Sequence, residues 1–326
     1  MQAIVVDAPG DESVLKPGDV SAPALRLGSI RIATRAAGVN RGDLLQRQGL
    51  YPPPPGASEI IGLECAGEVV AVADDVAAWK PGDRVMALLS GGGYAAEAVV
   101  AADNVMAIPD GLSYVEGAAL PEVMLTVYRN VWQLGDLPVG GSVLVHGGGS
   151  GIGTATIQLV KAWQGTVIVT AGTAEKCQRC LDLGADAAAN YNEDDFAGVV
   201  EQVMEGHGVD LVLDSIGAPY LAKNLACLAL EGRLVLIGLM GGAKTEINLS
   251  GLMLRRLQVI GSTLRALSEK QKAGVVSGFL RTFGESLRSG AVRPIVDTVF
   301  PLAEAAEAHR LMKASTHFGK IILEVD

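Results

Sequence analysis

The sequence predicts an α/β fold in which a mostly β domain is combined with a doubly wound domain built on a parallel sheet. Between about residues 140 and 264, short apolar runs rich in β-branched residues alternate with helical stretches. Strands that are apolar throughout are typical of a parallel sheet covered on both faces. Residues 1–120 differ, because their short strand-like runs are broken by turns such as YPPPPG and KPGD. That pattern is typical of an irregular β domain.

Composition and charge narrow the class of protein. The chain has 326 residues, of which 49% are hydrophobic, enough for two domains with a large buried core. Its formal net charge is −10 and it contains no basic block, which argues against nucleic acids and anionic membrane surfaces as partners. The start MQAIVVDAPG lacks the basic region and long apolar stretch of a signal peptide, and no apolar run is long enough to span a membrane. We therefore expect a cytoplasmic protein.

The segment after residue 264 returns to the pattern of the first domain. A helical stretch is followed by two strand-like runs, VDTVF and KIILEV, on either side of the helical run LAEAAEAHRLMKA. We expect the last strand to rejoin the N-terminal domain. The predicted organisation is then a domain of residues 1–122, completed by 265–326, with a second domain of residues 123–264 inserted in it.

The run HGGGSGIG at residues 146–153 follows the predicted strand SVLV and precedes the helical run TATIQLVK. Such a turn suits phosphate, because the first N–H groups of a helix lack intrahelical partners. A P-loop is unsupported, since Thr154 stands where a lysine is required. A hydrolase elbow lacks its last glycine, which is Ile152 here. The dinucleotide fingerprint fits better, with Gly149 and Gly151 in its first two places and Thr154 in the third.

The end of the next predicted strand, in VIVTAGTAEK, indicates which dinucleotide is bound. Dinucleotide enzymes that select NAD carry an acidic residue about 20 residues after the turn, to bind the ribose. Here that place holds Gly172 and Thr173, and Lys176 follows as a cation for a 2′-phosphate. This favours NADP, although Lys176 could also be an ordinary solvated helix lysine.

Cysteine and histidine give no support for a metal site. Cys65 and Cys227 stand alone, and Cys177 and Cys180 lie in a helical pattern with no second pair to complete a zinc site. We interpret them as two helix cysteines. The four histidines show no H-x-x-x-H spacing, so no metal is predicted.

Motifs along almost the whole chain resemble a known family. They include AAGVNRGDLLQRQGLYPPPPG, IIGLECAGEVV, KPGDRVMALLSGGGYAAEAVV, GAALPEVMLTVY, LVLDSIG, GLMGG and FGKIIL, besides the glycine turn. With these the chain resembles the medium-chain dehydrogenases/reductases, and within them the zinc-free NADPH:quinone oxidoreductases that include zeta-crystallin. The resemblance is strongest to the stress-inducible subgroup. Zinc-dependent relatives carry a cysteine and a histidine where Asn40 and Leu63 stand here.

The resemblance implies a fold and a cofactor site. It implies a GroES-like catalytic domain at 1–122, completed by 265–326, a Rossmann NADP-binding domain at 123–264, and NADPH enclosed between them. The residues implied to bind the cofactor are Asn40, Thr126, Gly147, Ser150, Gly151, Ile152, Gly153, Gly172, Thr173, Lys176, Tyr191, Ser215, Gly238, Leu239, Met240, Thr263, Leu264, Phe318 and Lys320. Glu64 is expected to be a buried structural carboxylate bonded to backbone.

The implied activity is metal-free hydride transfer from NADPH to a quinone. Tyr51 and Asn40 are the candidate hydrogen-bond donors to the product oxyanion, Tyr51 being the better acid, unless both only pack or bind cofactor and water supplies the proton. An enone or alkenal acceptor needs the same geometry, and a non-catalytic, crystallin-like NADPH-binding protein is the third alternative. Relatives also suggest a homodimer or tetramer paired through the edge strand at 257–264, with no nucleic acid or membrane partner.

Overall fold

A computed structural model describes residues 1–325 and divides the chain into two compact units. Unit 1 contains Met1–Leu125, Leu264–Arg288 and Pro294–Asp326, and unit 2 contains Thr126–Thr263 with Ser289–Arg293. These divisions fall close to the boundaries predicted at 122/123 and 264/265. The short segment Ser289–Arg293 was not expected in the second unit. It joins unit 2 because Gln158 bonds both the backbone N–H and the carbonyl of Arg293, at 2.9 Å each.

Unit 2 is built on one parallel sheet of six strands. Its strand order is β10-β9-β8-β11-β12-β13, with all neighbouring pairs parallel. Numbered along this unit the order is 3-2-1-4-5-6, the doubly wound order in which ligands bind where it reverses, between β8 and β11. The strands are β8 (Ser142–His146), β9 (Thr166–Ala171), β10 (Ala187–Asn190), β11 (Val209–Asp214), β12 (Leu228–Leu236) and β13 (Gln258–Gly261).

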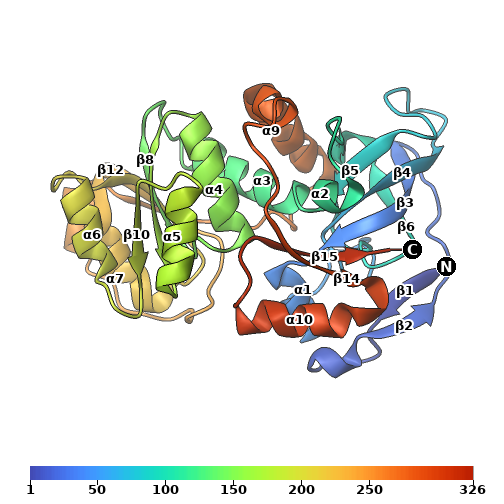
Figure 1. Cartoon of the computed structure of the whole chain (residues 1–326), viewed down its shortest axis with the longest axis horizontal. Helices are drawn as coiled ribbons and strands as arrows, with labels where there is room; N and C mark the ends of the chain where they lie inside the picture. Colours follow the sequence, from blue (N-terminus) through green and yellow to red (C-terminus); the bar gives the residue numbers. More distant parts are fainter. Residues whose placement is uncertain (326) are drawn as a thin grey trace. The chain divides into compact units, whose positions relative to one another are not determined.

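Helices cover both faces of this sheet. Figure 1 shows α4 and α5 on one side of it and α6 and α7 on the other. The helical segments are α4 (Gly151–Ala162), α5 (Ala174–Asp182), α6 (Phe196–Val203), η4 (Ala218–Tyr220), α7 (Leu221–Cys227), α8 (Leu249–Leu254) and the π-helix η3 (Arg129–Leu134). Helix α5 carries Cys177 and Cys180 on its buried face, as expected of helix cysteines, and Gly184 follows its end with φ +113°. The predicted doubly wound domain is therefore confirmed.

Unit 1 is mostly β. Its main sheet has the order β14-β15-β3-β4-β5-β7, with β6 also paired to β3, and a separate hairpin joins β1 to β2. The strands are β1 (Gln2–Val5), β2 (Lys16–Asp19), β3 (Ser29–Gly38), β4 (Glu64–Val72), β5 (Arg84–Leu88), β6 (Glu97–Ala101), β7 (Val105–Ala107), β14 (Val296–Pro301) and β15 (Lys320–Glu324). The last strand β15 pairs antiparallel with β3, which confirms that the C-terminal segment returns to the first domain.

Helices of unit 1 pack around this sheet. They are η1 (Glu12–Val14), α1 (Arg41–Arg47), η2 (Ala102–Asn104), α2 (Tyr114–Ala118), α3 (Pro121–Tyr128, which crosses into unit 2), α9 (Glu269–Arg288), η5 (Leu302–Glu304) and α10 (Ala305–Ala314). One core lies between α10 and the β15 side of the sheet, around Ile4, Val39, Ile321 and Met312. None of the helices in the described part of the chain is both long and apolar enough to cross a membrane.

Candidate active site

The glycine turn leads from β8 directly into α4. Gly147 has φ +80°, and the hydroxyl of Ser150 caps the helix by accepting a hydrogen bond from Gly153 N at 3.0 Å. The backbone N–H groups of Gly151 and Ile152 then open the helix, ahead of its first intrahelical hydrogen bond. These N–H groups and the positive end of the helix dipole suit a pyrophosphate.

Two glycines of the turn have no room for a side chain. A Cβ on Gly153 would lie 2.4 Å from the carbonyl oxygens of Gly147 and Gly148, and one on Gly148 would lie 2.8 Å from Val169 and Cys180. The close packing therefore occurs at Gly153, and not at Thr154, the residue that the fingerprint spacing assigns to the third glycine place. Thr154 instead donates its hydroxyl to Gly151 O inside α4. The turn is consequently a compact cradle of backbone atoms, which fits a dinucleotide.

The residues predicted around the 2′-phosphate lie together at the carboxyl ends of β9 and β10. Thr173 caps α5, its hydroxyl accepting from Lys176 N at 3.1 Å. The hydroxyl of Tyr191 approaches Gly172 so closely that a Cβ there would lie 2.4 Å from it. Tyr191 is 47% exposed, so its ring is available on the surface of unit 2. The cluster therefore brings a threonine, a lysine and a tyrosine together at this end of the sheet.

The segment at 238–242 is bound to the turn that follows β11. Met240 N donates to Ser215 O at 3.0 Å and Gly241 N to Ile216 O at 2.7 Å. Gly238 packs against Ser215, whereas Leu239 and Met240 are exposed. The predicted positions 238–240, which follow β12, are therefore held against the turn that follows β11.

A buried polar chain that the sequence reasoning missed supports this end of the sheet. His146 at the end of β8 contacts Thr170 Oγ1 through Nδ1 at 3.1 Å and Asn224 Oδ1 through Nε2 at 2.7 Å. Asn224 Nδ2 donates to the Asp214 carboxylate, which also accepts from the backbone N–H of Ile216 at 2.6 Å. Burial lowers the pKa of His146 to about 4, so the ring is neutral and holds the strand ends without a charge.

In unit 1, Glu64 is the centre of a buried hydrogen-bonded cluster. Its Oε1 accepts from Lys320 Nζ at 2.7 Å and from Asn40 Nδ2 at 2.8 Å, and its Oε2 accepts from Glu122 N at 2.8 Å. Lys320 Nζ donates also to Asn40 Oδ1 and to Val39 O. The expected buried carboxylate bonded to backbone is confirmed, but its ion pair with Lys320 was not foreseen. Two residues predicted for the cofactor, Asn40 and Lys320, have their polar atoms directed at Glu64.

This cluster does not fit a zinc ion. Leu63 has no ligand atom, and the Lys320 ammonium already provides the positive charge beside Glu64. Within residues 1–325, no group of three or more His, Cys, Asp or Glu side chains lies close enough to bind a metal ion. The Glu64 cluster is therefore a carboxylate–ammonium pair.

A second buried cluster joins the Glu64 cluster through the start of α1. Asp43 Oδ2 accepts from Asn40 N at 2.7 Å and from Tyr94 Oη at 3.1 Å, and Tyr94 Oη also contacts His309 Nε2 at 3.1 Å. Burial raises the pKa of Asp43 to about 7 and lowers that of His309 to about 3. These residues gave no recognisable signal in the sequence because they come from α1, the segment before β6, and α10.

Tyr51 lies in a loop of unit 1 held by Arg265. Arg265 Nη1 donates to Tyr51 O at 2.9 Å, and its guanidinium lies 5.0 Å from the centre of the Tyr51 ring. Burial raises the pKa of the Tyr51 hydroxyl; the nearby Glu122 carboxylate adds to this rise and Arg265 opposes it. The pKa of Glu122 is also raised, to about 8, mainly by burial and next by the charge of the neighbouring Glu64. A hydroxyl and a carboxyl that both hold their protons more firmly than usual thus interact in this unit.

The remaining predicted residues are distributed over both units. Thr126 and Thr263 belong to unit 2, whereas Leu264 and Phe318 belong to unit 1. Thr126 is buried, with its carbonyl bonded to Asn130, and Phe318 is buried, with its backbone N–H bonded to Asp297.

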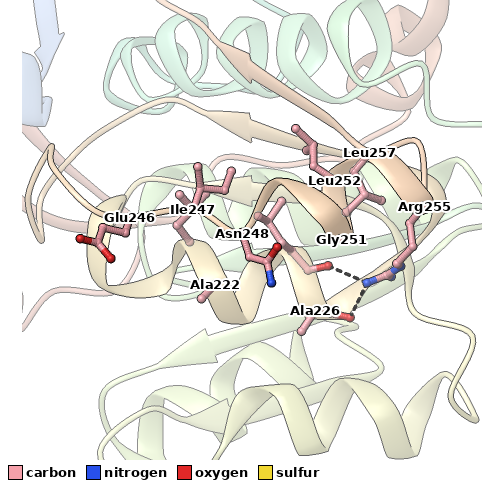
Figure 2. A pocket seen from close by; sticks show the side chains of 11 residues that line it. Ala222, Ala226, Glu246, Ile247, Asn248, Gly251, Leu252, Arg255 and Leu257 are labelled. Atoms are coloured by element: carbon pink, nitrogen blue, oxygen red, sulfur yellow. Dashed lines mark hydrogen bonds between the residues drawn. The ribbon is translucent and has the colours of Figure 1, made fainter.

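Unit 2 also contains a pocket of about 200 Å³ that shares no residue with the predicted site. Figure 2 shows it between α7 and the segment that contains α8. Its wall is mostly aliphatic, and Arg255 Nη1 at its rim donates to the carbonyls of Leu225 at 3.0 Å and Ala226 at 3.5 Å. That cation is already bonded to backbone, and the other polar side chains of the wall are Glu246 and Asn248, of which Asn248 caps α8.

Comparison with known proteins gives matches over both units. Residues 26–110 match the alcohol dehydrogenase GroES-like domain, and residues 151–277 match the family described as zinc-binding dehydrogenase. The quinone oxidoreductase of Rattus norvegicus is 32% identical over 326 residues, covering 99% of this chain and 97% of its own length.

Solved structures of related proteins are similar to this chain over both units. The Escherichia coli quinone oxidoreductase complexed with NADPH is 28% identical with a TM-score of 0.88, covering 99% of this chain and 100% of that one. The CurK enoyl reductase is 25% identical with a TM-score of 0.87, covering 100% of this chain and 99% of that one. The similarity therefore extends over almost the full length in both sequence and structure.

Proposed function

Because this chain belongs to the medium-chain dehydrogenase/reductase superfamily and is an oxidoreductase related to quinone oxidoreductases, we propose that it reduces quinones with NADPH and without a metal ion. The observation that carries the proposal is the Glu64 cluster, in which Lys320 supplies the cation. With no metal ion to polarise a carbonyl, the acceptor must already be strongly electrophilic. Quinones meet that requirement.

The cofactor is proposed to lie on the residues that unit 2 brings together. The 147–153 turn would bind the pyrophosphate, and Gly172, Thr173, Lys176 and Tyr191 would surround the 2′-phosphate. The rest of the cofactor would lie along Ser215, the 238–240 segment and Thr263, and along Leu264 of unit 1. NADPH, when bound, supplies the hydride. Asn40, Thr126 and Phe318 are proposed to lie near its nicotinamide, with Lys320 acting on that side through Asn40 and Glu64.

Tyr51 is proposed to protonate the oxyanion that hydride addition leaves on the acceptor. Its phenol is a weak acid in a partly buried loop, and proton donation at the transition state contributes typically ~10²–10⁴-fold to a rate. Asn40 is the poorer candidate, because its amide is not an acid and is bonded to Glu64 and Lys320.

The experiment is oxidation of NADPH and NADH by a naphthoquinone, followed at 340 nm. We expect turnover with NADPH well above that with NADH, and we expect Tyr51→Phe to lower kcat about 100-fold while NADPH affinity is retained. No acceptor-dependent oxidation would contradict the proposal. Stabilisation by NADPH without turnover would instead indicate a non-catalytic NADPH-binding protein.

An activated C=C bond is the second candidate acceptor. It is favoured by the similarity to the CurK enoyl reductase and by the same need for hydride and proton delivery. An alkenal assayed beside the naphthoquinone separates the two, since the better substrate has the higher kcat/KM.

We further propose that the chain forms a homodimer through β13. This strand is at the edge of the unit 2 sheet, where Val259 is exposed, and Met253 and Leu254 of the neighbouring α8 are 70% exposed. An apolar edge of this kind favours pairing with another strand. Sedimentation equilibrium should give a dimer at micromolar concentration, and Val259→Lys should give a monomer. A wild-type monomer would contradict this assembly.

A further inference from the structure

The chain re-enters unit 1 at Leu264. The next residue, Arg265, bonds three separate segments of that unit. Arg265 Nε donates to Ser90 O at 2.9 Å, Nη1 to Tyr51 O at 2.9 Å, and Nη2 to Gln46 Oε1 at 2.6 Å. All three nitrogens of the guanidinium are therefore used, in a fork that a lysine could not reproduce. Arg265 is only 3% exposed.

A second buried cation holds this arginine in place. Lys272, near the start of α9 and 1% exposed, donates from Nζ to Arg265 O at 2.9 Å and also to Ser90 Oγ. Among the residues that the structure describes, no carboxylate forms a salt bridge with either cation. Buried charges are normally paired, and here the compensation comes without a direct bond, from Glu122 for both cations, from Asp43 for Arg265 and from Glu269 for Lys272.

The segment that carries Tyr51 is closed by the same contacts. Gln46 accepts from Arg265 through Oε1 and donates from Nε2 to Glu59 O at 2.9 Å, so the two ends of the 46–59 loop are joined. Within that loop the guanidinium bonds the Tyr51 carbonyl and lies 5.0 Å from the centre of its ring. Arg265 therefore fixes the position of Tyr51 and places a positive charge on the face of its phenol.

That charge acts on the acidity of the phenol. Burial and the Glu122 carboxylate raise the pKa of Tyr51, and Arg265 acts in the opposite direction. A cation near a phenol favours its anionic form, so the proton leaves more readily. In the balanced reaction the acceptor would receive a hydride, with its electron pair, from NADPH if that cofactor is bound, and a proton from Tyr51 Oη. The phenolate that would remain lies beside the Arg265 guanidinium, which would stabilise it until solvent returned a proton.

We propose that Arg265, secured by Lys272, is a positioning residue that holds Tyr51 and promotes its proton donation, an inference that rests on the proposed function. It acts through Tyr51 and is not itself placed against the acceptor. Its removal should therefore affect the chemical step and its pH dependence more than the binding of NADPH.

The test compares Arg265→Gln and Arg265→Lys with a matched control. Arg84 provides the control, because it also lies over a tyrosine ring, 4.8 Å from the centre of Tyr114, and donates to a carbonyl, that of Leu112. The measurements are kcat with a naphthoquinone against pH, NADPH affinity by fluorescence, and titration of the Tyr51 phenol by ¹³C NMR, with Tyr51→Phe for assignment.

We expect Arg265→Gln to lower kcat more than tenfold, to leave NADPH affinity within about twofold, and to move the basic limb of the kcat profile and the Tyr51 titration to higher pH. Arg265→Lys should lower kcat but keep the titration close to that of the wild type, because the charge remains, and it provides a second variant if the first fails to fold. Arg84→Gln should match the wild type in all three measurements.

The proposal is overturned if the Tyr51 titration and the basic limb are the same in Arg265→Gln and the wild type, or if NADPH affinity falls as much as kcat. The NMR titration needs no turnover. A wild-type protein without quinone or alkenal reduction would therefore contradict the proposed function, while the phenol titrations would still decide the role of Arg265.

Discussion

Lys320 donates a hydrogen bond to Glu64 across 2.7 Å, and both side chains are almost completely shielded from solvent. The two residues are 256 positions apart, at the starts of β15 and β4. The pair thus links the returning C-terminal strand to the centre of unit 1.

Removing one member of this pair should be strongly destabilising. Lys320→Met leaves the Glu64 carboxylate buried without its counter-ion, which costs about 3–5 kcal/mol, and the double variant with Glu64→Gln should recover much of that loss. Urea unfolding followed by circular dichroism measures the free energies.

The matched control for this pair is the exposed pair formed by Arg288 and Glu285, whose side chains are 66% and 80% exposed. Arg288→Met should change the free energy of unfolding by less than about 1 kcal/mol. If Lys320→Met were as mild as this control, the buried pair would not have the stabilising role assigned to it.

Lys176→Ala should remove the preference for NADPH over NADH. A charge-assisted hydrogen bond contributes roughly 1.5–3 kcal/mol, so the ratio of the two kcat/KM values should fall about 10–100-fold. The kcat/KM with NADPH should fall while that with NADH is unchanged, because NADH has no 2′-phosphate. Lys223→Ala is the control, since that lysine forms an exposed ion pair with Asp195 in the same unit. An unchanged ratio in Lys176→Ala would show that the 2′-phosphate is bound elsewhere.

Gly153→Ala should distort the phosphate cradle. The new methyl group would meet the carbonyl oxygens of Gly147 and Gly148 at 2.4 Å, so the turn must open, at a cost of roughly 1–3 kcal/mol. We expect NADPH affinity, measured by isothermal titration, to fall at least tenfold. Gly198→Ala, in α6 of the same unit, has open space around it and should be neutral or more stable by up to about 1 kcal/mol. Equal NADPH affinity in the two variants would contradict the assignment of this turn.

Acid should destabilise unit 2 through His146. The pKa of His146 is about 4 in the folded protein against an ordinary 6.5. Between these two pH values the imidazole is therefore protonated in the unfolded chain and neutral in the folded protein. The contribution of neutral His146 to the free energy of unfolding is therefore fully present above pH 6.5. It declines as pH falls from 6.5 to 4, by roughly 3 kcal/mol in all.

The His146→Gln variant isolates this effect, because glutamine can still donate to Asn224 but does not titrate. The difference in unfolding free energy between wild type and variant, measured from pH 7.5 to 4, should change in favour of the variant as pH falls. A constant difference over that interval would mean that His146 titrates normally in the folded protein.

The local features of this fold follow from the sequence alone. The apolar strands of the parallel sheet and the glycine turn before α4 were predicted and agree with the structure. They depend on neighbouring residues, since helix capping, turn formation and strand burial are determined over a few positions along the chain. The alternation of strands and helices predicts a parallel sheet covered by helices, whereas the strand order comes from the structure.

Tertiary structure alone decided which distant side chains share a site. The sequence places Asn40, Glu64 and Lys320 in three unrelated motifs, and it gives no sign that Arg265 bonds residues 46, 51 and 90, or that Ser289–Arg293 joins unit 2. Such contacts have no periodicity. They arise because a buried charge must find a partner once packing has removed water, and packing brings that partner from anywhere in the chain.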